Sequence, residues 1–278
     1  MMKLAYSTLA CPDWTFEQCV EAAQRAGYEG LELRLLDGEI ITSSLTREQR
    51  QRISTLAARA HLSIIGLDTS LRVAQTDATS RSEQIGEGLA LLELARDLEA
   101  PFIRVFAGPP PGTSVEGAIA GAAATLEPLL PRARELGVAI ALETHDAFSS
   151  SAVVAQVLKQ IEDPIVGALW DFLHPYRVGE TAQETARQLG GRLLHVHVKD
   201  GQRPEEQQTE WKLTLLGEGD VPTLEMLAAL RAIGYQGWLS VEWEKKWHPE
   251  LVGPEVALPQ HAAKLRESLS SLPKESSL

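Results

Sequence analysis

The chain has 278 residues, of which 44% are hydrophobic, so it can bury a large core as two average domains or as one α/β barrel. Its formal net charge of −12, with no basic patch, argues against nucleic acid and anionic membrane surfaces as partners. Two cysteines give no disulfide framework, and no apolar run has the length of a signal peptide or membrane span, so we expect a cytoplasmic protein.

Strands and helices alternate from the start of the chain. The first half predicts strands at residues 4–8, 30–34, 62–67 and 102–106. A first helix begins at Asp13 or Thr15 and ends at Gly27, a second begins at the capping box of Thr46 and Gln49, and a third covers 81–99.

The same alternation continues in the second half. A helix over residues 114–136 is expected to bend or break at Pro128 and Pro131, and Gly137 closes it. The remaining pattern predicts strands at 138–142, 165–170, 193–198 and 238–241, and helices at 150–161, 181–189, 221–233 and 259–269.

Eight strand–helix units therefore follow one another with no break in composition. Such alternation indicates a parallel sheet, and eight units in a chain of this size favour one closed (β/α)8 TIM barrel over residues 1–269. Residues 270–278 read as a disordered C-terminal tail. A doubly wound open sheet has the same pattern and stays an alternative.

The segment 195–200, His-Val-His-Val-Lys-Asp, reads as a strand with polar groups on one face. His195, His197 and Lys199 share that face, and the two valines point the other way. Buried imidazoles and an amine need water, carboxylates or a metal as partners. Two structural histidines and a surface lysine are the alternative. His195 lies one layer deeper than His197, so we expect it to pack or to support the residues above it.

Acidic and imidazole side chains end four consecutive strands: Glu143, Asp171, His197 and Glu242. A parallel barrel brings these strand ends to one face, where three carboxylates would repel one another unless a cation lay between them. Oxygen ligands with one imidazole suit a single divalent ion, with Mn²⁺ favoured and Mg²⁺, Co²⁺ or Zn²⁺ tolerated. Each residue also has an alternative role without a metal: Glu143 in an ion pair at the barrel rim, Glu242 as a loop acid, Asp171 as a loop cap and His197 as a buried structural histidine.

Other strand ends carry further charged and aromatic groups. Arg104, Glu32 and Arg34 are predicted either to contact substrate or to form a buried ion pair inside the barrel. Some tryptophans could wall a sugar pocket, although core packing or shielding of the rim is the default interpretation for Trp14, Trp170, Trp211, Trp243 and Trp247.

Six segments together resemble one known family: 27–34, 142–145, 170–174, 195–200, 216–220 and 234–238, the last leading to Val241 and Glu242. The sequence is similar to the sugar phosphate isomerase/epimerase family with the xylose isomerase-like barrel, from the first strand to about Pro259. The resemblance implies that Glu143, Asp171, His197 and Glu242 hold one divalent metal. It also implies that His174 contacts the substrate near that metal. Further candidate substrate contacts are Lys199, Arg104 and His145.

We therefore expect a divalent-metal-dependent isomerase or epimerase that acts on a small sugar or polyhydroxy ketone. The metal would polarise a carbonyl, and a proton would move through a metal-bound cis-enediolate. Glu143 and Glu242 would flank the substrate as the acid/base groups, and His174 or Lys199 would stabilise the enediolate oxygen. Whether the enzyme is an epimerase or an aldose–ketose isomerase stays open, as does a phosphate on the substrate.

Other functions share this fold. A lyase that dehydrates an inosose-type cyclic polyol would use the same metal and base. An endonuclease IV-like abasic-site nuclease would need more metal ligands and a basic groove, which the charge of −12 opposes. A non-catalytic sugar-binding barrel would leave the glutamate pair unused. The expected partner is a small carbohydrate, with no nucleic acid and no membrane, and barrels of this type often pair as homodimers.

Overall fold

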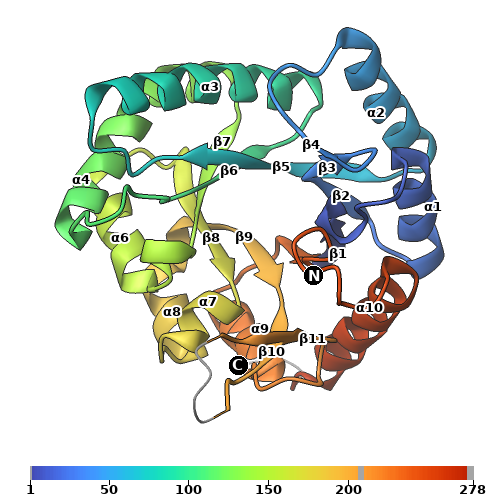
Figure 1. Ribbon diagram of the computed structural model, residues 1–278. Helices are drawn as coiled ribbons and strands as arrows, with labels where there is room; N and C mark the ends of the chain where they lie inside the picture. The colour runs from blue at the N-terminus through green and yellow to red at the C-terminus, as the bar shows by residue number, and fades with distance from the viewer. Residues whose placement is uncertain (1, 206–209, 274–278) are drawn as a thin grey trace.

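The computed structural model describes residues 2–205 and 210–273, and it contains a closed barrel of eight parallel strands in the order β1-β12-β9-β8-β7-β6-β5-β2. Helices form a ring outside the strands (Figure 1). This architecture confirms the predicted (β/α)8 barrel. The strands are β1 (Lys3–Ser7), β2 (Gly30–Leu33), β5 (Ser63–Arg72), β6 (Phe102–Phe106), β7 (Ala139–Glu143), β8 (Val166–Asp171), β9 (Leu193–Val198) and β12 (Trp238–Val241).

The helices follow the predicted order and keep their predicted caps. Thr15, not Asp13, caps the first helix and forms a capping box with Gln18, and Thr46 does the same with Gln49. Gly27 ends the first helix with a φ of 72°, a conformation that glycine adopts without strain. The helices are α1 (Phe16–Ala26), α2 (Arg47–Arg59), α3 (Ala78–Asp97), α4 (Val115–Leu126), α5 (Leu130–Leu136), α6 (Ser151–Gln160), α7 (Leu173–Arg177), α8 (Ala182–Leu189), α9 (Thr223–Ala232) and α10 (Pro254–Ser271).

Prolines interrupt one predicted helix and are accommodated in another. The break predicted at Pro128 and Pro131 is present, since a 3₁₀ turn (Glu127–Leu129) separates α4 from α5. The last helix was predicted to start at Pro259, but α10 starts at Pro254, a first-turn position where no N–H is needed. Pro259 lies inside it. The helix continues to Ser271, into the stretch predicted as a tail, and residues 274–278 of that stretch lie outside the described residues.

Short elements that the sequence analysis did not predict lie at the carboxyl ends of the strands. They are α7 and two hairpins, β3 (Leu35–Leu36) with β4 (Glu39–Ile40) and β10 (Asp200–Gln202) with β11 (Lys212–Thr214). The Asp200 carboxylate anchors the second hairpin, because it accepts hydrogen bonds from the backbone N–H groups of Gly201, Gly217, Gly219 and Val221 at 2.8 to 3.1 Å. No helix in the described parts of the chain is long and apolar enough to cross a membrane.

The inside of the barrel differs between its two ends. A small apolar cluster of Phe102, Ala141 and Leu169 fills the lower interior, separate from the main core between strands and helices. Gly66 makes room for it, because a Cβ at this position would lie 2.3 Å from the Phe102 ring. Above this cluster, toward the carboxyl ends of the strands, the buried side chains are charged or polar. The apolar cluster therefore forms a floor under a layer of buried polar and charged side chains.

Candidate metal centre

The four candidate metal ligands meet at the carboxyl end of the barrel. Glu143 and Asp171 are the last residues of β7 and β8, His197 lies in β9, and Glu242 directly follows β12. One ligand atom from each lies within 4.8 Å of those of the other three. None of the four residues is more than 4% exposed. The structure thus brings together the set that the strand ends predicted.

Asp171 has two functions at this centre. Its Oδ1 accepts hydrogen bonds from the backbone N–H groups of Leu173 (2.8 Å) and His174 (3.2 Å), so it caps the short helix α7. Its own N–H donates to Thr144 Oγ1 at 3.0 Å. Oδ2 is buried and accepts no hydrogen bond from the described residues, although the Lys199 ammonium lies 3.1 Å away. The capping bonds therefore hold Oδ2 toward the other carboxylates.

His197 stands between the candidate ligands and a buried glutamate. Its Nδ1 lies 3.1 Å from Glu143 Oε1 and 3.5 Å from Glu242 Oε2. Its Nε2 lies 3.0 Å from both oxygens of Glu32. The strands β2 and β9 are separated by β1 and β12 around the barrel, so this contact crosses the interior. It fixes the imidazole with Nδ1 toward the centre.

Glu32 also accepts hydrogen bonds from Ser240 Oγ at 2.6 Å and from His195 Nε2 at 3.3 Å. Burial raises the pKa of Glu32, but the two histidines outweigh burial and hold the pKa well below its usual value. The ionised carboxylate can only accept, so all three neighbours must donate. Glu32, His195 and His197 also have the spacing of a metal group, yet these hydrogen bonds already satisfy the carboxylate. We interpret them as the support beneath the centre.

Two buried cations hold the carboxylates on either side. Arg104 donates from Nε to Glu143 Oε2 at 2.5 Å, and its Nη1 lies 3.2 Å from Asp68 Oδ1. Lys199 Nζ lies 2.6 Å from Glu242 Oε2 and also pairs with Glu244. Arg104 and Lys199 were predicted to contact substrate, and in this structure both pair with candidate metal ligands.

These ion pairs set the charge of the centre. Burial raises the pKa of Glu143, but Arg104 and His197 outweigh it and lower the pKa to about 2. Burial likewise raises the pKa of Glu242, and Lys199 with His197 holds it well below its usual value. Burial dominates at Asp68 and raises its pKa to about 6. Both Glu143 and Glu242 are therefore ionised at neutral pH.

A pair of histidines borders the centre beside α7. The His174 ring is 5% exposed, and neither of its nitrogens has a hydrogen-bond partner among the described residues. Burial, reinforced by Lys199, holds its pKa well below the usual value, so the ring is neutral. His145 packs against it with ring centroids 4.6 Å apart and pairs with Asp146 at 2.9 Å. A buried, unpartnered imidazole is suited to bind a ligand atom.

The donor set can be tested against a metal on chemical grounds. Three carboxylates and one imidazole nitrogen, close together and withdrawn from water, match the ligands of a hard or borderline divalent cation. The unpartnered Asp171 Oδ2 and the hydrogen bond behind His197 fit the same interpretation. The residues present therefore fit a divalent ion, and they do not select one metal.

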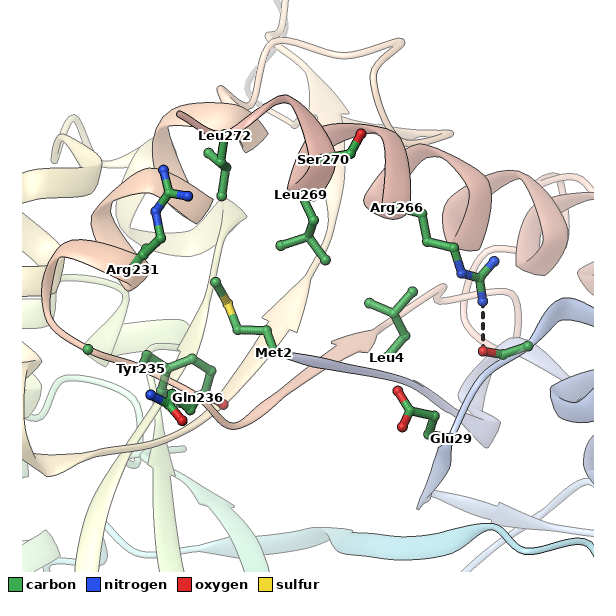
Figure 2. A pocket seen from close by; sticks show the side chains of 12 residues that line it. Met2, Leu4, Glu29, Arg231, Tyr235, Gln236, Arg266, Leu269, Ser270 and Leu272 are labelled. Carbon is green, nitrogen blue, oxygen red and sulfur yellow. Dashed lines mark hydrogen bonds between the residues drawn. The ribbon is translucent and has the colours of Figure 1, made fainter. Parts of the chain in front are cut away.

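A cavity lies at the opposite end of the barrel. It has a volume of about 590 Å³ and is lined by Met2, Leu4, Leu269 and Leu272 together with polar side chains, as Figure 2 shows. Met2 and Leu4 lie at the amino end of β1, and Leu269 and Leu272 lie at the carboxyl end of α10. No candidate ligand group lies among its lining residues, so we place the functional site at the charged end of the barrel.

Two residues of the site, Asp68 and Ser240, were missed by the sequence analysis, as was the pairing of Glu244 with Lys199. Asp68 belongs to β5, which extends to Arg72 although we predicted its end at residue 67. An acid directly after an apolar run is the same signal that identified Glu143 and Asp171, so Asp68 could have been found. Ser240 and the pairing of Glu244 with Lys199 carried no such signal.

Comparisons with known proteins agree with this fold. A family model described as xylose isomerase-like TIM barrel matches residues 20–273. The L-ribulose 3-epimerase of Methylomonas sp. (strain DH-1) is 25% identical over 261 residues, which cover 88% of this chain and 84% of that enzyme. An uncharacterized protein of Methanocaldococcus jannaschii is 26% identical over 125 residues, 42% of this chain, and the match spans only 41% of its own length.

One solved structure is similar over the whole barrel. The crystal structure of IOLI protein with a binding zinc atom superimposes with a TM-score of 0.85 at 19% sequence identity, covering 98% of this chain and 100% of that one. At this identity the likeness shows the fold alone.

Proposed function

Because the chain belongs to the xylose isomerase-like TIM barrel family, we propose that it is a divalent-metal-dependent isomerase that epimerises a small ketose by proton transfer. The observation that carries the proposal is the pair of buried carboxylates, Glu143 and Glu242. They come from strands separated by β8 and β9, and both approach His197 Nδ1, at 3.1 and 3.5 Å. Two such groups can serve opposite faces of one carbon. The likeness to an L-ribulose 3-epimerase supports an epimerase.

In this proposal Glu143, Asp171, His197 Nδ1 and Glu242 would hold the metal. The bound cation would supply positive charge that polarises the substrate carbonyl and makes the neighbouring C–H more acidic. The zinc in the IOLI structure, which shares this fold, supports a divalent ion without identifying the metal used here.

The protein side chains divide the proton transfer between them. Glu143 is ionised and takes the proton from the carbon next to the carbonyl. Glu242 returns a proton to the opposite face after taking one up from solvent, and the Lys199 ammonium, 2.6 Å from Glu242 Oε2, holds this carboxylate in position. Neutral His174, with no partner among the described residues, donates to the substrate oxygen that gains charge.

Solvent exchange tests this function. With Mn²⁺ present in heavy water, L-ribulose and D-fructose should take up deuterium at C3 and yield their C3 epimers. Glu143→Gln and Glu242→Gln should each lower the rate by about 10² to 10⁴, the range for a lost acid/base group. Glu29→Gln, a carboxylate at the far end of the barrel, is the matched control. Full activity in Glu143→Gln would contradict the proposal, and a product that has lost water would indicate a lyase.

A further inference from the structure

A third buried cation at this end of the barrel lacks the partner that the other two have. Arg34 directly follows β2 and is 8% exposed. Arg104 and Lys199 each pair with carboxylates, whereas no carboxylate of the described residues lies within 4.0 Å of the Arg34 guanidinium. The nearby Asp68 directs its carboxylate to Arg104 instead, at 3.2 Å.

The Arg34 guanidinium is nevertheless held firmly in place. Its Nη1 donates to the backbone oxygen of Asp68 at 3.0 Å and to Ser70 Oγ at 2.9 Å. The Trp247 ring lies 5.9 Å from its central carbon, in the range of a cation–π contact. Within residues 2–205 and 210–273, Nε and Nη2 donate no hydrogen bond. One edge of the guanidinium therefore keeps its donors free.

A second cation lies on the same side. Lys246 Nζ donates to the Gly38 oxygen at 2.8 Å, which ties the loop after β12 to the β3–β4 hairpin, and it too has no carboxylate within 4.0 Å in the described parts of the chain. The protein has 38 acidic and 26 basic residues, so cations without acidic partners are not explained by a shortage of acids.

Burying a charge without a counter-charge is costly, and a guanidinium edge matches the two oxygens of a carboxylate or phosphate. We propose that Arg34 binds an anionic group at the end of the substrate chain remote from the carbon that exchanges its proton. The inference rests on the proposed function, and it names the substrate class: an acidic or phosphorylated ketose. The contacts from Arg34 through Asp68 and Arg104 to Glu143 link this subsite to the reacting end.

Three probes with the same carbon chain test the proposal. D-fructose, D-fructose 6-phosphate and D-fructuronate differ only at C6, which carries a hydroxyl, a phosphate or a carboxylate. Their dissociation constants are measured by titration calorimetry on the Mn²⁺-loaded protein. We expect at least one anionic probe to bind tenfold or more tightly than D-fructose. Tighter binding of the phosphate probe, of the carboxylate probe or of both shows which anionic group the subsite accepts.

Variants separate Arg34 from general charge effects. Arg34→Gln should reduce the preference for the anionic probe to less than threefold, and Arg34→Lys should retain part of it. Arg25→Gln on the outside of α1 makes the same change in net charge and should leave the preference intact. Equal affinity for D-fructose, no measurable binding of any probe, or a preference that survives in folded Arg34→Gln would each overturn the inference. Loss of C3 exchange with a retained preference would contradict only the proposed function.

Discussion

Replacing Glu32 by glutamine tests how the centre is held. The carboxylate accepts from His197, His195 and Ser240, at 3.0, 3.3 and 2.6 Å, and it has no proton of its own to give. Glutamine has nearly the same shape, but its amide nitrogen would face one of these donors. Because His197 Nε2 lies 3.0 Å from both carboxylate oxygens, the amide nitrogen faces it in either orientation and favours the tautomer in which Nε2 accepts and Nδ1 carries the proton. A protonated Nδ1 cannot bind a metal.

The expected loss follows from this change of tautomer. Removing the carboxylate behind a ligating histidine typically costs 10- to 100-fold in metal affinity, or about 1.4 to 2.8 kcal/mol. Affinity for Mn²⁺ and Zn²⁺ is measured by competition with a chromophoric chelator, which needs no turnover. Ser240→Ala removes one donor and keeps the carboxylate, so it should change affinity less than threefold. Unchanged affinity in a folded Glu32→Gln protein would refute the reasoning.

Two further predictions concern stability. His261 is buried on α10 and donates to the Ala257 oxygen, and burial lowers its pKa to about 4. The unfolded chain takes up a proton on this histidine near pH 6.5, whereas the folded chain does so only near pH 4. His261 should therefore lower the free energy of unfolding by up to roughly 3 kcal/mol as the pH falls from about 7 to 4. Urea unfolding of His261→Gln should show a correspondingly flatter pH dependence, and parallel curves for the two proteins would contradict this. Gly66→Ala should cost roughly 1 to 3 kcal/mol by urea unfolding, because the new Cβ would meet the Phe102 ring, and a neutral effect would mean that the ring has room to move.

Much of the fold was predictable because its signals are local. A capping box needs residues three positions apart, as Thr15 and Gln18 are, and a strand shows its period within a few residues. The candidate ligands were predictable for a related reason. Each ends or directly follows an apolar strand, and a parallel barrel collects such ends on one face.

The support beneath the ligands was not predictable in the same way. Glu32 and His197 are 165 residues apart and touch across the barrel interior, a contact that no local pattern reports. Arg34 poses the converse problem. Its sequence position suggested an internal ion pair or a substrate contact, and only the folded arrangement shows that nearby Asp68 is already committed to Arg104. Which buried charges pair with one another depends on the assembled barrel interior.

The floor formed by Phe102, Ala141 and Leu169 limits the route by which a substrate can reach the charged residues. Its side chains, at most 5% exposed, separate the charged residues at the carboxyl ends of the strands from the cavity at the amino ends. Reactant and product must then enter and leave by the carboxyl end alone, so the product has to depart before the next substrate binds. A compound bound over the carboxyl end would block binding and release together, whereas one bound in the opposite cavity would block neither.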